Sequence, residues 1–171
     1  MTVIDDTAVN KNFLSQLGFM FTVRKMPRVS FTVQRVTLPG LSITPTQYPN
    51  PLVSIPLSGD HISFEELALT FIVEEELTNY FEMYNWINGL GFPETPDQYK
   101  DLTNQPSSLG VESDIVLSIT NNIKNVKFQA TFRDAFPLSL SSLEFNTTDD
   151  DVSYLTATAT FRYTLYTFEK L

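Results

Sequence analysis

The chain of 171 residues contains no cysteine, and this absence excludes disulfides, thiolate metal sites and cysteine nucleophiles. It has six glycines, none of them spaced as in a phosphate-binding loop. No apolar run approaches the roughly 20 residues that a bilayer span requires. The N-terminus carries Asp5 and Asp6 and no basic start followed by an apolar run, so we expect no secretory signal. The absence of cysteine favours synthesis in a reducing cytoplasm.

Catalytic signatures are also scarce. His61 is the only histidine, it follows Asp60, and no Gly-x-Ser-x-Gly motif is present to supply a nucleophile. A hydrolytic site built on Asp60, His61 and Glu65 is the weakest of the functional hypotheses. The three aspartates at 149–151 lack the alternating ligands, central glycine and distant glutamate of a calcium loop, and a solvated turn explains them. We therefore predict no catalytic residue, no metal and no cofactor.

What the chain does have is bulky apolar material and an uneven charge. Hydrophobic residues make up 42% and aromatic residues 13% of a chain whose length suits one domain. The formal charge is −9, and residues 61–120 hold one basic and eleven acidic residues, a balance of −10. Nucleic-acid binding depends on neutralising phosphates, so the acidic character of residues 61–120 argues against a DNA-binding protein.

Alternation of apolar and polar residues with a period of two dominates the sequence and predicts half-buried β-strands. The final run is the longest and carries threonines on its polar face, where a branched Cβ suits a pleated surface. The predicted strands lie within residues 19–23, 29–33, 67–73, 115–119, 126–132 and 155–165.

One segment has helical spacing instead. The apolar residues between Leu77 and Leu90 recur every three or four positions, the glutamates at 74–76 suit a helix N-terminus, and Gly89, Gly91 and Pro93 can end the helix. Trp86 is expected to be a core or interface aromatic. The predicted fold class is mainly β, an antiparallel sandwich or barrel with one amphipathic helix.

Two long loops and an arm complete the predicted organisation. Residues 39–56 carry five prolines, which exclude a central strand although 52–57 can pair at an edge, and residues 92–112 form the second loop. We expect residues 1–18 to be an N-terminal arm and residues 19–171 to be a single β domain. Such a domain has many strand edges, which either neighbouring copies or its own loops can cover. The pattern alone leaves these two alternatives open.

A family resemblance favours the first alternative. The segment Phe-Thr-Val-Gln-Arg-Val-Thr-Leu-Pro-Gly at 31–40 resembles the early strand and turn of tail tube proteins from contractile-tailed bacteriophages. The elements that follow keep the family's order: a loop with Tyr48 and Asn50, a short strand, Gly59-Asp60, an alternating strand and an aromatic helix. Ala-Phe-Pro at 135–137 and a last strand ending in Phe-Arg-Tyr are also similar. The resemblance spans roughly residues 19 to 168.

The resemblance implies a structural virion protein with a tail-tube-like fold. Members of the family form homohexameric rings that stack into the inner tail tube, through which DNA passes without specific binding. It further implies tail sheath and baseplate proteins as partners, no membrane, and a location in the tail after assembly in the host cytoplasm. The arm before Gly18 and the segment 41–57 are expected to contact the adjacent subunit or ring. The expected interface residues are Leu41, Tyr48, Asn50, Pro51, Val53, Ile55 and Leu57.

Two alternative functions remain. The long loop 92–112 and the Tyr-Asn-Trp-Ile-Asn-Gly helix end depart from the family pattern, and such departures suit a baseplate ring that initiates the tube. From a different class, the chain could be a stand-alone binding module. Its site would be the groove between the proline-rich loop and the helix, lined by Tyr48, Tyr80, Tyr84 and Trp86.

Overall fold

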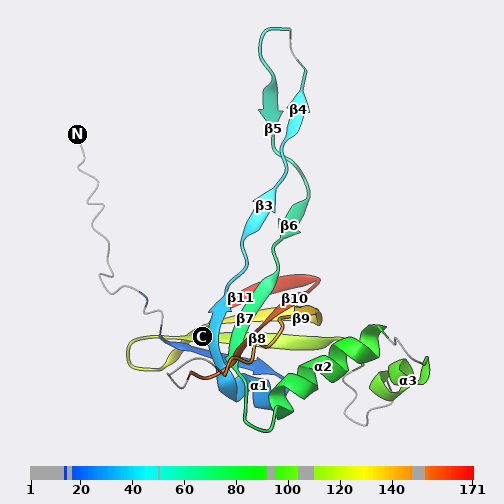
Figure 1. Ribbon diagram of the computed structural model, residues 1–171. Coiled ribbons are helices and arrows are strands. Elements are labelled where there is room, and N and C mark those ends of the chain that lie inside the picture. The colour runs from blue at the N-terminus through cyan, green and yellow to red at the C-terminus, as the bar shows by residue number, and fades with distance from the viewer. Residues whose placement is uncertain (1–13, 15–16, 50, 92–94, 104–109, 148–152) are drawn as a thin grey trace.

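The computed structural model describes residues 14, 17–49, 51–91, 95–103, 110–147 and 153–171, and the body of the molecule is one antiparallel sheet folded over on itself (Figure 1). Six strands follow the order β1-β8-β9-β10-β7-β2, and β11 pairs with β9. Their bounds are β1 Phe19–Val23, β2 Val33–Thr37, β7 Leu67–Ile72, β8 Ser113–Thr120, β9 Val126–Leu140, β10 Thr156–Arg162 and β11 Leu165–Lys170. The predicted mainly antiparallel β fold is confirmed.

The long strand β9 joins the two halves of the sheet. Its first part pairs with β8 and β11, and its second part pairs with β10. Between them Asp134 has a φ of 54°, in the left-handed region that L residues rarely adopt, and the strand turns there. The segment that pairs with β9 is interrupted as well. The single strand predicted for 155–165 is wrong, because Tyr163 and Thr164 separate β10 from β11.

The core lies between the two halves and includes several large aromatic side chains. Phe71, Phe132 and Phe161 are fully buried, and they come from three different strands. Phe132 contacts Tyr163 edge to face, with 5.0 Å between the ring centroids. The alternation therefore places these three phenylalanines correctly in the core. Phe128, predicted on the same face as Phe132, is instead 39% exposed.

A short helix, α1 (Pro27–Thr32), replaces the strand predicted for 29–33. Pro27 occupies the first turn, where its fixed φ suits a helix and its missing N–H costs nothing. Val29 is fully buried, whereas Phe31 is 90% exposed, so these two residues do not share one face as the alternation predicted. The Val23 backbone N–H donates to Ser30 Oγ at 3.1 Å and ties α1 to the end of β1.

The predicted amphipathic helix is confirmed as α2 (Thr78–Gly91), and a further short helix, α3 (Asp97–Thr103), lies in the loop that follows. Gly89 does not end α2. It is buried inside the helix, where an added Cβ would lie 3.4 Å from Leu102 of α3. Leu102 packs against this glycine, so α2 and α3 are in contact at the end of the body shown at the bottom of Figure 1.

Two side chains of α2 hold the helix to the rest of the body. Asn79 is fully buried, and its amide donates to the Ile72 carbonyl at 2.7 Å and to Thr32 Oγ1 at 3.0 Å. Trp86 is a core residue, as predicted, and its Nε1–H donates to the Val111 carbonyl at 2.9 Å. Among the described helices, none has the length and apolar character needed to cross a bilayer.

Candidate functional site

The most prominent feature of the molecule is a long hairpin that projects from the body between β2 and β7 (Figure 1). It is built from two successive two-stranded ladders, of which the first pairs Leu41 with Phe64 and the second pairs Thr46 with Leu57. The strands are β3 (Leu41–Ile43), β4 (Thr46–Tyr48), β5 (Ile55–Leu57) and β6 (Ile62–Phe64). The segment expected to be a loop is therefore a paired ribbon.

Two tyrosines near the end of the chain, one between β10 and β11 and one in β11, anchor the root of this hairpin. Tyr163 Oη donates to the Glu65 carbonyl at 2.8 Å, and Tyr166 Oη donates to the Pro39 carbonyl at 3.2 Å, so both legs are held. Burial raises the pKa of Tyr163 to about 12, which keeps the phenol protonated and able to donate at all ordinary pH values. Across the legs, the Gly40 N–H donates to Glu65 Oε2 at 3.1 Å.

Removing the Tyr163 hydroxyl should loosen this root. In a Tyr163→Phe variant the Glu65 carbonyl loses its partner at a half-buried position, and we expect the free energy of unfolding to fall by about 1–2 kcal/mol. Urea unfolding followed by circular dichroism measures the change. Tyr154→Phe is the matched control, because Tyr154 is mostly exposed, and it should leave the stability unchanged. Equal effects in the two variants would contradict the anchoring role.

The legs of the hairpin approach each other closely at Gly59. A Cβ built on this glycine would lie 2.0 Å from the Thr44 carbonyl oxygen, a distance that real Cβ atoms do not show. Only glycine fits, and the close approach falls between the two ladders, where the ribbon in Figure 1 crosses itself. The close crossing at Gly59 therefore fixes the orientation of the outer ladder relative to the inner one.

The predicted interface residues are on this hairpin. Leu41, Tyr48, Val53, Ile55 and Leu57 are all exposed, Pro51 is exposed at the tip, and Asn50 lies outside the described residues. Ile43, Leu52 and Ile62 are exposed apolar residues of the hairpin that the sequence analysis did not select. Between residues 40 and 64 the only acidic or basic side chains are Asp60 and His61. An apolar, nearly uncharged projection of this kind is typical of a surface that another protein covers.

Free strand edges flank the body. Within the described residues, β2 pairs only with β7, and the second part of β9 pairs only with β10. These are the two edges of the half-sheet β9-β10-β7-β2. Pro137 lies in this part of β9, in agreement with the rule that proline within sheets is confined to edge strands. Unpaired edges on both sides allow copies to join laterally into one continuous sheet.

The outer face of the same half-sheet is lined with hydroxyl groups. Thr70 and Thr158 lie with their Oγ1 atoms 3.3 Å apart, and Ser139 Oγ lies 2.6 Å from Thr160 Oγ1. The nearby Arg162 and Glu66 form an exposed ion pair at 3.9 Å. This face is therefore polar without a strong net charge.

The residues weighed as catalytic do not form a site. Asp60 Oδ1 lies 2.5 Å from His61 Nδ1, but both side chains are more than nine-tenths exposed on the hairpin, and Glu65 is engaged at the hairpin root. The aspartates at 149–151 lie outside the described residues. In the part of the chain that the structure describes, no three acidic, histidine or cysteine side chains gather to hold a metal ion.

The groove expected for a binding module is not formed either. Tyr48 lies on the projecting hairpin and α2 lies at the opposite end of the body, so the two do not line one groove (Figure 1). Tyr80 Oη donates to the Ser141 carbonyl at 3.2 Å, and Trp86 is buried.

Comparison with known proteins points in one direction. A family model described as "Phage tail tube protein" matches residues 4–169. The tail tube terminator protein of Enterobacteria phage T4 is 28% identical over 144 residues, which cover 82% of this chain and 78% of that protein.

Solved structures of contractile systems share the fold. The tube terminating cap of the anti-feeding prophage aligns with a TM-score of 0.66 and 16% identity over the whole of both chains. A chain of the PVC extracellular contractile injection system, from its sheath/tube terminator structure, gives 0.65 and 18% over 95% of this chain and 99% of that one. A chain of the PVC sheath-tube complex gives 0.64 and 20% over the whole of both chains.

Proposed function

From the premise that the chain belongs to the phage tail tube protein family, we propose that it forms a ring that terminates the inner tube of a contractile tail. Family membership makes the chain a structural tail protein and not an enzyme. The T4 relative is a tail tube terminator, and this similarity supports a position at the end of the tube over that of the repeating subunit.

The half-sheet β9-β10-β7-β2 is the part of the molecule that builds the ring in this proposal. Its two free edges lie on opposite sides, so the β2 edge of one copy can pair with the β9 edge of the next. Six copies closed in this way form a barrel around a channel. The hydroxyl-lined outer face of this half-sheet then faces the channel, where a surface without basic clusters lets DNA pass without holding it.

The two ends of the molecule are chemically unlike, and this contrast carries the choice of a terminator. The projecting hairpin is apolar and nearly uncharged, whereas residues 74–103, which include α2 and α3 at the opposite end, hold seven acidic residues and one basic residue. A repeating subunit needs two ends that fit each other. An apolar end and an acidic end do not, so each end of this ring suits a different partner.

In the same proposal, the hairpin is the part that contacts the adjacent subunit or the last ring of the tube. The predicted residues Leu41, Tyr48, Asn50, Pro51, Val53, Ile55 and Leu57 then supply the contact, together with the exposed Ile43 and Leu52. The acidic end remains available to other tail proteins, such as those of the sheath. We place the protein in the virion tail, assembled in the host cytoplasm.

Light scattering coupled to size exclusion, followed by negative-stain microscopy, tests ring formation. We expect rings with a mass near six times 19.4 kDa. Adding preassembled tubes of the same phage then tests the position: a terminator binds one tube end and stops elongation. Tubes built from this chain alone would indicate the repeating subunit, and nucleation of new tubes would indicate a baseplate initiator. A monomer that neither assembles nor binds tube ends would overturn the proposal.

A further inference from the structure

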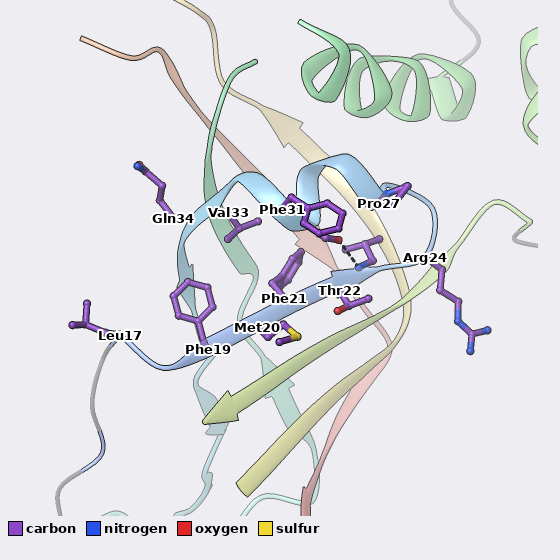
Figure 2. A pocket seen from close by; sticks show the side chains of 12 residues that line it. Leu17, Phe19, Met20, Phe21, Thr22, Arg24, Pro27, Phe31, Val33 and Gln34 are labelled. Atoms are coloured by element: carbon purple, nitrogen blue, oxygen red, sulfur yellow. Dashed lines mark hydrogen bonds between the residues drawn. The ribbon is translucent and has the colours of Figure 1, made fainter. Parts of the chain in front are cut away.

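An open apolar trough runs between β1 and the segment formed by α1 and β2 (Figure 2). It consists of two adjoining hollows of about 770 and 810 Å³. Leu17, Phe19 and Gln34 line both hollows, which makes the two continuous. Figure 2 shows Phe19, Phe21 and Phe31 along its length, with Arg24 and Gln34 pointing outward at its margin.

The trough lies beside strand edges that have no hydrogen-bonded neighbour among the described residues. β1 pairs only with β8, and β2 pairs only with β7, so within the described residues the edges on the trough side are unpaired. Leu17 and Phe31 are each at least 90% exposed, and Met20 is 60% exposed. Exposed apolar side chains beside a free strand edge create an aggregation hazard that proteins normally cover.

The chain itself supplies a segment of suitable length at the entrance of the trough. Leu14 and Leu17 line the second hollow, and thirteen residues precede Leu14. Thirteen extended residues reach roughly 43 Å, whereas the five residues of β1 span only about 17 Å. The preceding segment is thus long enough to turn back and follow β1 to its end.

The charge and the apolar content of residues 1–13 also match those of the trough lining. Arg24 and Arg35 line the trough, and neither takes part in the ion pairs formed among the described residues. The segment 1–13 carries two adjacent acids, Asp5 and Asp6, and the apolar residues Val3, Ile4, Val9 and Phe13. An acidic, partly apolar strand is the complement of an apolar trough with basic side chains.

We propose that residues 1–13 occupy this trough of the same chain in the unassembled subunit, as an added strand along the free edge of β1. Attachment at Leu14 gives the segment a high effective concentration at the trough, so its own chain outcompetes a second copy. The segment covers Phe31 and Met20 and protects the edge until assembly. The placement of residues 1–13 in the trough does not depend on the proposed function.

The absence of cysteine allows a direct test in the full-length chain. Gln34→Cys is combined in turn with Val3→Cys, Thr7→Cys or Val9→Cys, and mild oxidation is followed on non-reducing gels. Thr156→Cys, exposed on β10 two strands away from β2, replaces Gln34→Cys in the control pairs. We expect at least one pair to form an intramolecular disulfide roughly tenfold faster than its control.

Two results would overturn the proposal. Rates equal to the control in all three pairs would show that the segment does not lie in the trough. Disulfide-linked dimers in place of crosslinked monomers would show that the segment of a second copy occupies it.

Charge reversal gives an independent readout. Asp5→Lys with Asp6→Lys should slow the crosslink roughly threefold, and adding Arg24→Glu with Arg35→Glu should restore the rate. An unchanged crosslinking rate in both sets of variants would contradict binding of Asp5 and Asp6 by the basic side chains of the trough. Circular dichroism of each variant confirms that the fold is kept.

Discussion

Replacing Phe71 by alanine is expected to lower the free energy of unfolding by about 3–5 kcal/mol, the range measured for fully buried aromatic side chains. Phe71 has no exposed surface. On β7 it lies between Ala157 of β10 and Val33 of β2. Because Ala157 is small and the strands are fixed by their ladders, the neighbours cannot fill the cavity that remains. Urea unfolding at a concentration that keeps the chain monomeric measures the loss.

Phe145→Ala is the matched control. Phe145 is 74% exposed, so the same truncation removes no core contacts, and we expect a change within about 0.5 kcal/mol. The slope of the unfolding free energy against urea should be the same in both variants, since the surface exposed on unfolding is nearly equal. A loss for Phe71→Ala as small as that of the control would mean that Phe71 is not in the core.

The alternation of the sequence predicts strands well where one face is buried and the other is wet. The runs at 19–23, 67–73 and 115–119 become β1, β7 and β8 for this reason. It fails at 29–33, where three alternating residues are too short a run to exclude a helical turn and Pro27 favours the helix. The alternation of apolar and polar residues continues from β10 into β11. The sequence around Tyr163 and Thr164 therefore does not indicate that the strand is interrupted there.

The proline-rich segment shows a different limit of sequence reasoning. Proline cannot donate a hydrogen bond and is therefore excluded from central strands, but a projecting two-stranded ribbon has no central strand. Pro56 lies within β5 opposite Gln47 without disrupting the ladder. The exposed apolar residues of the hairpin could be proposed from family resemblance. Its anchors, Tyr163 and Tyr166, could not, because they lie about a hundred residues away in the sequence.

Changing Ile55 and Leu57 to aspartate is expected to abolish ring formation or binding to tube ends while leaving the subunit folded. Both side chains lie on β5 of the hairpin, away from the core, and are 42% and 49% exposed, so the unfolding free energy of the free subunit should change by less than about 1 kcal/mol. In an interface each new carboxylate would be desolvated without a partner, which costs several kcal/mol. Light scattering of the double variant measures the loss of assembly.

Ile123→Asp provides the control because it makes the same change at an exposed isoleucine outside the hairpin. Ile123 is 79% exposed in the turn between β8 and β9. If the hairpin is the assembly surface, this variant assembles as the wild-type chain does, and only the hairpin variant fails. Failure of both would indicate that added negative charge on an acidic chain prevents association, because like charges repel wherever they are placed. Normal assembly of the hairpin variant would instead assign the contact to the strand edges β2 and β9 alone.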